Sequence, residues 1–173
     1  MPAKGLGLHH VDLAVSDVER SLVFYLELLG PLGWQVAVRY PTYRGTEDVV
    51  YLGTPAEPGV GRFGLRQADG GEHRYYGVGV EHLAFEVDTR QEVDQAFARA
   101  KAAGAEIHFP PEFDRDEPGY YAVFVFDPDG IRVEVFAWTP GDDGGARPMT
   151  QQGPANSSQP TSTSPGNGEA AQP

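Results

Sequence analysis

The same order of sequence patterns occurs twice in this 173-residue chain, and this repeat limits the fold more than any other feature. Three pairs of equivalent residues are separated by 72, 73 and 74 positions: His10 and His82, Ser16 and Thr89, and Gly30 and Gly104. Offsets that change so little between one end of the pattern and the other indicate duplication of one supersecondary unit.

Each copy of the repeat is predicted to form a βαβββ unit. An alternating strand leads into a helix with an apolar stripe, and three further strands are separated by turns rich in Gly and Pro. The spacing of Ser16 and Glu19 predicts a capping box for the first helix, with Asp17 as a rival cap, and Thr89 and Glu92 predict a capping box for the second. Gly30 and Gly104 are expected to end the two helices. The strands are expected at 8–15, 33–40, 47–52 and 62–67 in the first copy, and at 80–87, 106–109, 120–126 and 131–138 in the second. We therefore predict an α+β fold of two βαβββ modules, whose curved mixed sheets pair around a common cleft.

Composition divides the chain into two modules, a linker and a tail. Residues 6–67 are assigned to the first module and 79–139 to the second, and the two together make one domain. The Gly-rich, polar segment 68–78 is the expected linker. Residues 140–173 contain no aromatic residue and no Leu, Ile or Val, so they cannot bury enough apolar surface to offset the entropy of ordering. We expect this tail to be disordered.

The charge and the absence of cysteine exclude several functions. A net charge of −12 repels nucleic acid and anionic membrane surfaces. A chain without cysteine has neither disulfides nor thiolate metal sites. No apolar run has the length of a membrane span, and none follows the N-terminal residues as a signal peptide would require. We expect a cytoplasmic protein whose partner is a small molecule.

A predicted hairpin near the end of the second module places a carboxylate in the middle of a strand. The turn Asp-Pro-Asp-Gly at 127–130 joins two apolar strands, and Pro and Gly suit its backbone angles. In the second strand Ile131, Val133 and Val135 share one face, while Glu134 lies on the other. Taken alone, Glu134 is best interpreted as a solvated side chain, paired with Arg132 on the same face.

Two histidines change that interpretation of Glu134. His10 and His82 occupy matching positions on the first strands of the two modules, each on the face opposite the aliphatic one. If the two open faces enclose a cleft, both imidazoles and the carboxylate point into it. Two histidines and one carboxylate with open positions suit Fe(II), Mn(II), Ni(II), Co(II) or Zn(II).

Three neighbours of these predicted ligands receive supporting or structural roles. Asp12 and Glu86 share faces with the two histidines, and each is interpreted either as a second partner of a ligand or as plain cleft lining. His9 is one residue out of phase with His10, so it is expected to face the helix layer or solvent and to be structural.

Three stretches also resemble a known family. They are His-Val-Asp-Leu-Ala-Val from residue 10, Glu-His-Leu-Ala-Phe-Glu-Val at 81–87 and Phe-Asp-Pro-Asp-Gly-Ile-Arg-Val-Glu-Val at 126–135. Together they are similar to the vicinal oxygen chelate superfamily of glyoxalases, bleomycin resistance proteins and extradiol dioxygenases, over residues 6–138. The resemblance implies paired βαβββ units, a divalent metal and a substrate that chelates it through neighbouring oxygens. The family's ligand positions fall on His10, His82 and Glu134.

Four positions depart from particular members of that family. Glyoxalase I and methylmalonyl-CoA epimerase use a fourth ligand where this chain has Gly64, so those two activities are not expected. Extradiol dioxygenases carry a tyrosine where Phe124 stands and an acid–base histidine near Gln67, so the usual proton-transfer groups for ring cleavage are missing. Fosfomycin-modifying members place a threonine at the position of Asp12, whose carboxylate would repel a phosphonate.

Two further groups of polar residues are weaker candidates for contact with a substrate. Loops and strand ends around the expected cleft carry Tyr120, Tyr121, His108, Arg115 and His73. A basic and aromatic cluster lies between the second and third strands of the first module and comprises Arg39, Tyr40, Tyr43 and Arg44. Surface or packing roles are favoured for the first group, and an exposed hairpin tip explains the second equally well.

Three functions stay open from the sequence, one of which is a scaffold that retains a metal without turnover. The first is a metal-dependent enzyme of lyase, isomerase or dioxygenase type, acting on a small substrate with vicinal oxygens. The alternative is a non-catalytic protein that sequesters a drug or another ligand, as bleomycin resistance proteins do, for which the acidic charge suits a cationic drug. Two modules in one chain can close a cleft internally or exchange units across a dimer, and the resemblance favours a homodimer.

Overall fold

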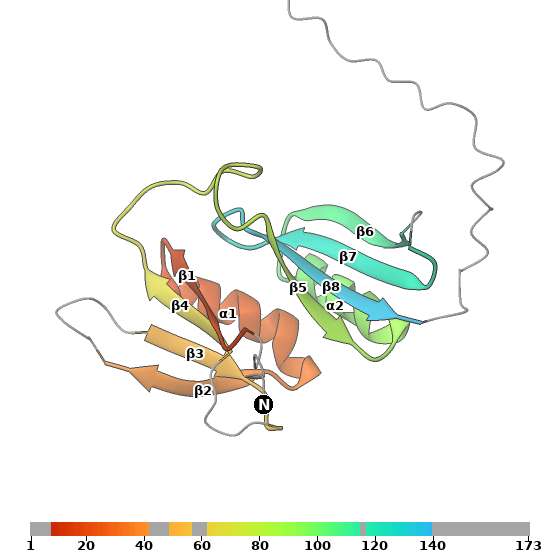
Figure 1. Ribbon diagram of the computed structural model, residues 1–173, viewed down its shortest axis with the longest axis horizontal. Helices are drawn as coiled ribbons and strands as arrows, with labels where there is room; N and C mark the ends of the chain where they lie inside the picture. Colours follow the sequence, from red (N-terminus) through yellow and green to blue (C-terminus); the bar gives the residue numbers. More distant parts are fainter. Residues whose placement is uncertain (1–7, 42–48, 57–61, 115–116, 140–173) are drawn as a thin grey trace, which may run out of the picture.

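A computed structural model describes residues 8–41, 49–56, 62–114 and 117–139, which form two consecutive βαβββ units (Figure 1). The first unit contains β1 (Val11–Val15), α1 (Val18–Leu29), the short 3-10 helix η1 (Gly30–Leu32), β2 (Gln35–Tyr40), β3 (Val49–Gly53) and β4 (Phe63–Gln67). The second contains β5 (His82–Val87), α2 (Arg90–Ala102), β6 (Ile107–Phe113), β7 (Tyr120–Phe126) and β8 (Arg132–Trp138). The predicted repeat and the α+β fold class are therefore confirmed.

Each unit folds into its own four-stranded mixed sheet with the same topology. The strand orders are β1-β4-β3-β2 and β5-β8-β7-β6. In both sheets the first strand runs parallel to the last, with Val11 opposite Phe63 and His82 opposite Arg132, and the remaining pairs are antiparallel. In each sheet the first strand of the unit lies at the edge and the last strand is its neighbour. Ala84 on β5 therefore lies directly beside Glu134 on β8.

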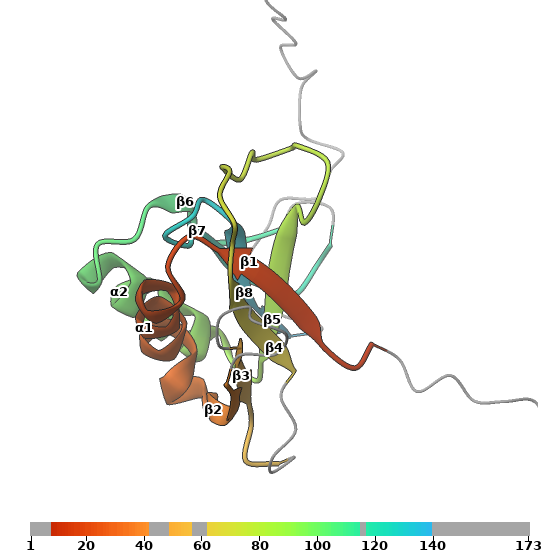
Figure 2. The same cartoon turned by 90° about the vertical axis from the view of Figure 1, so that its left-hand side faces the viewer.

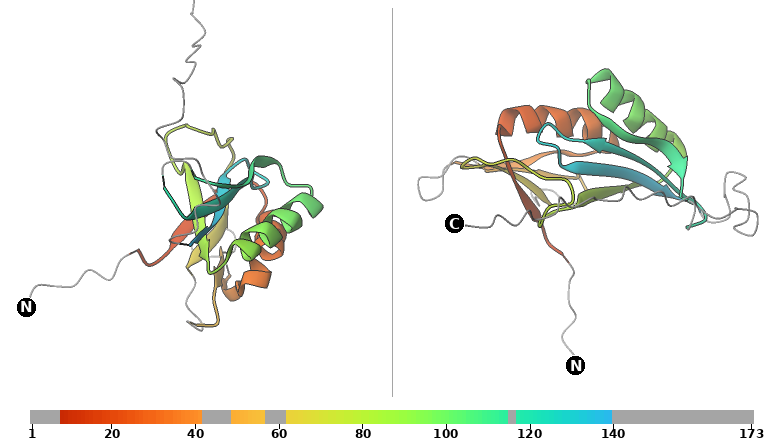
Figure 3. Two further views of the ribbon diagram at one scale, coloured as in Figure 1. Left: turned by 90° about the vertical axis from the view of Figure 1, so that its right-hand side faces the viewer. Right: turned by 90° about the horizontal axis from the view of Figure 1, so that it is seen from above.

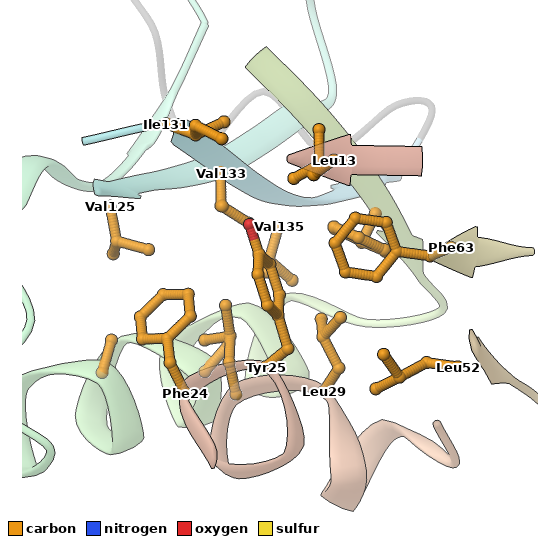
Figure 4. Packing of buried hydrophobic residues seen from close by; sticks show 14 of the residues in the cluster. Leu13, Phe24, Tyr25, Leu29, Leu52, Phe63, Val125, Ile131, Val133 and Val135 are labelled. Carbon is orange, nitrogen blue, oxygen red and sulfur yellow. The ribbon is translucent and has the colours of Figure 1, made fainter. Parts of the chain in front are cut away.

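Both helices cover the same side of the two sheets, and the opposite sheet faces carry no helix (Figures 2 and 3). Strand parity follows this layering, because Leu13, Val15 and Phe85 face the helices and are buried while Ala84 and Glu86 on the open face are exposed. A single hydrophobic core runs through both units (Figure 4). The two modules are thus packed against each other through the helix layer.

The helix ends confirm the predicted capping box of the second helix and decide between the two candidate caps of the first. Thr89 and Glu92 form the predicted capping box of α2, but the cap of α1 is Asp17, whose side chain accepts from the backbone N–H of Arg20. Ser16 does not cap α1; its hydroxyl and its backbone N–H bind Asp129 in the second unit instead. The α-helix α1 ends at Leu29 with Gly30 as its C-cap, as predicted, and the chain continues through η1 to Gly33, which adopts φ 92°.

One strand is longer than its sequence predicted. The strand expected to end at Phe109 continues through Pro110 and Pro111 to Phe113 as β6. Proline has no backbone N–H to donate, but β6 is an edge strand with a neighbour on one side only, and its register with β7 shifts between Phe109 and Glu112. An edge position and an irregular register together allow the two prolines within the strand, which the prediction had ended before them.

A buried polar contact joins the helix of the first unit to the hairpin turn of the second. The hydroxyl of Tyr25 on α1 donates to Oδ2 of Asp127 at 2.9 Å, and both residues are buried. Oδ1 of Asp127 accepts from the backbone N–H groups of Asp129 and Ile131, so this carboxylate caps the turn. The turn ends at Gly130 with φ 80°, as predicted for a glycine there.

The Asp127 carboxyl predicts an unusual pH dependence of stability. Burial raises its pKa more than its hydrogen bonds lower it. Its contribution to stability is therefore fully present below the pKa that the carboxyl has in the unfolded chain, and it is lost as pH rises through the higher folded pKa. We expect the unfolding free energy of the wild-type chain, minus that of Asp127→Asn, to fall across this window in urea titrations at a series of pH values. A difference that rises with pH would contradict the expectation.

Several predicted features lie outside the described residues, namely the tail at 140–173, Arg115, Tyr43, Arg44 and the first part of the strand expected at 47–52. No helix in the described part of the chain is long and apolar enough to cross a membrane.

Candidate metal site

Glu134 is a buried carboxylate on the otherwise open face of the second sheet. It is only 3% exposed, although it lies on the face of β8 that points away from the helices. Its Oε1 accepts a hydrogen bond from the Tyr120 hydroxyl at 2.6 Å, and its Oε2 lies 3.1 Å from Nε2 of His82. The interpretation of Glu134 as a solvated side chain is therefore wrong, and two of the three predicted ligands are neighbours.

The other ring nitrogen of His82 is also occupied. Its Nδ1 contacts Oε2 of Glu81, and a guanidinium nitrogen of Arg132 lies 3.2 Å from the same Nδ1. Arg132 also pairs with Oε1 of Glu81 at 2.5 Å. The sequence suggested a pair between Arg132 and Glu134, but Arg132 lies opposite His82 in the parallel register and reaches Glu81 instead.

Burial sets the electrostatics of this site. It raises the pKa of Glu134, and the hydrogen bond from Tyr120 and the nearby His82 and Arg132 offset only part of that rise. Burial and the Glu134 carboxylate together raise the pKa of the Tyr120 hydroxyl, which stays a hydrogen-bond donor. The hydrogen bond from His82 lowers the pKa of Glu81, so that carboxylate is ionised at neutral pH.

Both nitrogens of His82 therefore face carboxylate oxygens. A neutral imidazole has one N–H, and in the tautomer that donates to Glu81 this N–H is on Nδ1. The lone pair of Nε2 and Oε2 of Glu134 are then two acceptors 3.1 Å apart, an arrangement that needs a proton or a cation between them. A divalent ion meets this need with a nitrogen and an oxygen ligand, so the donor set fits a metal.

His10, the third predicted ligand, does not join this pair within the chain. It is exposed on the first unit, where its Nδ1 lies 2.9 Å from Nδ1 of His9 and its ring packs edge-on against Tyr51. His9 is exposed, as expected, but it contacts His10 rather than standing apart from it. Within residues 8–41, 49–56, 62–114 and 117–139, no three His, Asp or Glu side chains are placed to hold one metal ion.

Asp12 occupies the space beside Gly64. A Cβ atom at Gly64 would lie 2.3 Å from Oδ1 of Asp12 and 2.8 Å from the Tyr51 ring, so a larger side chain does not fit there in this arrangement. Oδ2 of Asp12 accepts from Tyr51 at 3.1 Å and from Nε of Arg66 at 2.8 Å. A ligand side chain at position 64 is thus absent from the sequence, and one introduced there would displace the Asp12 side chain.

The remaining candidates fall into different environments. Tyr121 turns away from the open face, because its hydroxyl donates to Asp94 on α2, and burial raises its pKa to about 12. His108 stacks between Phe109 and Phe126, and this contact favours the packing interpretation. A third group lies elsewhere: His73 lines a separate cavity of about 610 Å³ near the end of β1, Gln67 donates to the Ser16 carbonyl, and Arg39 pairs with Glu19.

Three residues around His82 were missed by sequence reasoning. Glu81 precedes the strand and stands out of phase with His82, Arg132 was assigned to another partner, and Tyr75 lies in the expected linker. Yet the Arg132 guanidinium donates to the Tyr75 hydroxyl at 2.8 Å and forms an ion pair with Glu81. Strand alternation carries no signal for such a contact, because it connects a loop, a strand start and a neighbouring strand.

Comparisons with known proteins agree with this fold. A sequence profile of the Glyoxalase/Bleomycin resistance protein/Dioxygenase superfamily matches residues 7–135. The uncharacterized protein YqjT of Bacillus subtilis (strain 168) is 30% identical over 138 residues, covering 75% of this chain and 98% of YqjT. The chain therefore belongs to the glyoxalase/bleomycin resistance/dioxygenase superfamily.

Two solved structures are also similar to this chain. The glyoxylase/bleomycin resistance protein/dioxygenase domain from Frankia sp. EAN1pec has a TM-score of 0.62 and 26% identity, covering 80% of this chain and 100% of that domain. A mutant of the fosfomycin resistance protein FosX from Listeria monocytogenes, complexed with Mn(II) and 1S,2S-dihydroxypropylphosphonic acid, has a TM-score of 0.58 and 21% identity, covering 79% and 96%. The second likeness shows a shared fold.

Proposed function

We propose that this protein is a divalent-metal-dependent enzyme whose metal is held by His82, Glu134 and His10. The observation that carries the proposal is the buried carboxylate of Glu134, whose Oε2 lies 3.1 Å from Nε2 of His82. A bound divalent ion would act as a Lewis acid on a small substrate that offers two neighbouring oxygens. Mn(II) in the FosX complex supports the choice of a divalent metal.

Residues around the pair support ligand roles for both side chains. Tyr120 binds Oε1 of Glu134 and leaves Oε2 directed at His82, while Glu81 binds Nδ1 and leaves Nε2 directed at Glu134. Hydrogen-bonded partners of this kind orient metal ligands in proteins. Burial of Glu134 keeps water away from the carboxylate and strengthens its attraction for a cation.

We further propose that His10 comes from a second copy of the chain. His10 belongs to the first sheet and the pair to the second, and the open faces of both sheets lie on the side opposite the helices (Figure 3). Faces that point the same way cannot enclose one ion within a chain, but the first sheet of one copy can cover the second sheet of another. Leu8, Tyr40, Phe109 and Trp138 are apolar side chains left exposed on a single chain.

The reaction belongs to the lyase, isomerase or dioxygenase type. The residues available for proton transfer and the charge near His10 limit the choice of reaction and substrate. Phe124 has no hydroxyl, and the Gln67 amide is bound to the Ser16 carbonyl, so neither residue exchanges a proton with a substrate. Asp12 brings a negative charge next to His10, although Arg66 neutralises part of it. A neutral substrate with vicinal oxygens is therefore favoured over a phosphonate.

Metal content tests the proposed function directly. The purified full chain should contain a divalent metal on elemental analysis and should bind Mn(II) after the metal is removed. His82→Ala and Glu134→Gln should each weaken Mn(II) binding by more than about 100-fold, because loss of a ligand exceeds the cost of losing an outer partner. Glu27→Gln on the exposed face of α1 removes the same charge as Glu134→Gln and should bind Mn(II) like the wild type. Equal binding by all four chains would refute the proposal.

Ligand sequestration without catalysis is the second candidate, favoured by aromatic side chains beside the pair. Phe109, Phe124 and Glu134 are consecutive partners across β6, β7 and β8, and Phe109 is 42% exposed. Such a surface suits a flat cationic drug in an acidic protein. Tight binding of such a drug by the metal-free chain, unchanged in His82→Ala, would favour this function over the enzyme.

A further inference from the structure

Arg132, the first residue of β8, is largely buried and lies between two aromatic rings. Its guanidinium lies over the ring of Phe124, 4.7 Å from the ring centroid, and over the ring of Tyr75, 5.2 Å from the centroid. Only 11% of its side chain is exposed. Two aromatic rings from different segments, the loop before β5 and the strand β7, thus hold one charged group in place.

The nitrogens of this guanidinium connect the loop to the predicted metal ligand. One terminal nitrogen donates to the Tyr75 hydroxyl at 2.8 Å. The other pairs with Oε1 of Glu81 at 2.5 Å and lies 3.2 Å from Nδ1 of His82. Since the second oxygen of Glu81 contacts the same Nδ1, Glu81 bridges Arg132 and the imidazole.

We propose that Arg132 is a positioning residue for the metal site, which fixes Glu81 against Nδ1 of His82 and thereby directs Nε2 toward Glu134. This inference rests on the proposed metal-binding function. Glu81 has a side chain that is 37% exposed and flexible, so without Arg132 it is free to rotate into solvent. The imidazole then loses the partner that selects its tautomer and orientation. Through its hydrogen bond with Arg132, Tyr75 connects the loop that joins the modules to the same positioning contacts.

Mn(II) binding by the full-length metal-free chain tests this role. Arg132→Lys keeps the charge but cannot contact Tyr75 and Glu81 together, and it should weaken Mn(II) binding by about 10- to 100-fold. The matched control is Arg90→Lys, since Arg90 also stacks on an aromatic ring, that of Phe113, at 5.3 Å. This control should bind Mn(II) like the wild type. Tyr75→Phe removes a single hydroxyl and provides a milder variant if Arg132→Lys fails to fold.

Two readouts separate positioning from a purely structural role. The visible absorption spectrum of bound Co(II) reports its ligand geometry and should change in Arg132→Lys and Glu81→Gln, but not in Arg90→Lys. Because Arg132 acts through Glu81, the double variant Arg132→Lys/Glu81→Gln should bind Mn(II) no more weakly than Glu81→Gln alone. Additive losses, or an unchanged Co(II) spectrum, would overturn the role of Arg132.

The outcomes also distinguish this inference from the proposed function. If the wild type binds Mn(II), His82→Ala does not, and Arg132→Lys binds as tightly as the wild type, the positioning role is wrong while the metal site stands. If the wild type itself binds no Mn(II), the metal-dependent function fails and the positioning role fails with it.

Discussion

A mixture of His10→Ala chains and Glu134→Gln chains is expected to recover about a quarter of the wild-type metal sites, although each variant alone binds no metal tightly. If the site forms between two chains, a mixed dimer has one site with both substitutions and one with neither. Random pairing makes about half of the dimers mixed, and half of the sites in those dimers are intact. Mn(II) bound per chain, measured after the two variants are unfolded and refolded together, gives the fraction directly.

The chain offers a matched control for this experiment. His82 and Glu134 lie on the same sheet, so His82→Ala and Glu134→Gln alter the same half of the site. A mixed dimer of these two variants contains no intact site, and their mixture should recover nothing. Recovery with the first pair and none with the second supports a site shared by two copies. No recovery with the first pair, in dimers shown to be mixed, would mean that His10 does not act across the interface.

The same residues show how far the sequence alone could predict the site. Strand alternation placed Glu134 and His82 on one face of the second sheet, and the structure brings them to 3.1 Å. Alternation also placed His10 on the open face of the first unit, where it is exposed. It could not say whether the two open faces meet within one chain, because parity fixes the direction of a side chain and not the position of a neighbouring sheet.

Contacts between separate segments could not be predicted from the sequence for a related reason. Arg132 was expected to pair with Glu134, two residues away on the same face, but the parallel register places it opposite His82 and beside Glu81. Ser16 was one of two candidate caps for α1, but it binds Asp129 in the other unit, which left Asp17 as the cap. In both cases a tertiary partner displaced a local one.

Tyr25→Ala is expected to destabilise the protein by about 3–5 kcal/mol, the range for removal of a large buried aromatic side chain. Tyr25 is 0% exposed, and its ring packs against Phe63 on β4 with the centroids 4.6 Å apart (Figure 4). Its hydroxyl binds the buried Asp127 in the hairpin of the second unit. The substitution therefore opens a cavity in the shared core and breaks the polar contact between the modules. Urea unfolding at a fixed protein concentration measures the loss.

Tyr25→Phe separates the two contributions, because it keeps the ring and removes only the hydroxyl. We expect it to cost about 1–3 kcal/mol, the penalty for leaving a buried acceptor without its donor. That penalty should shrink in the Asp127→Asn background, where the buried group carries no charge. Tyr40→Phe removes a hydroxyl from a tyrosine that is 54% exposed and should change stability by less than about 0.5 kcal/mol. If Tyr25→Ala and Tyr25→Phe were equally mild, the modules would not depend on this side chain, and their packing through the helix layer would have to rest on other residues of the core.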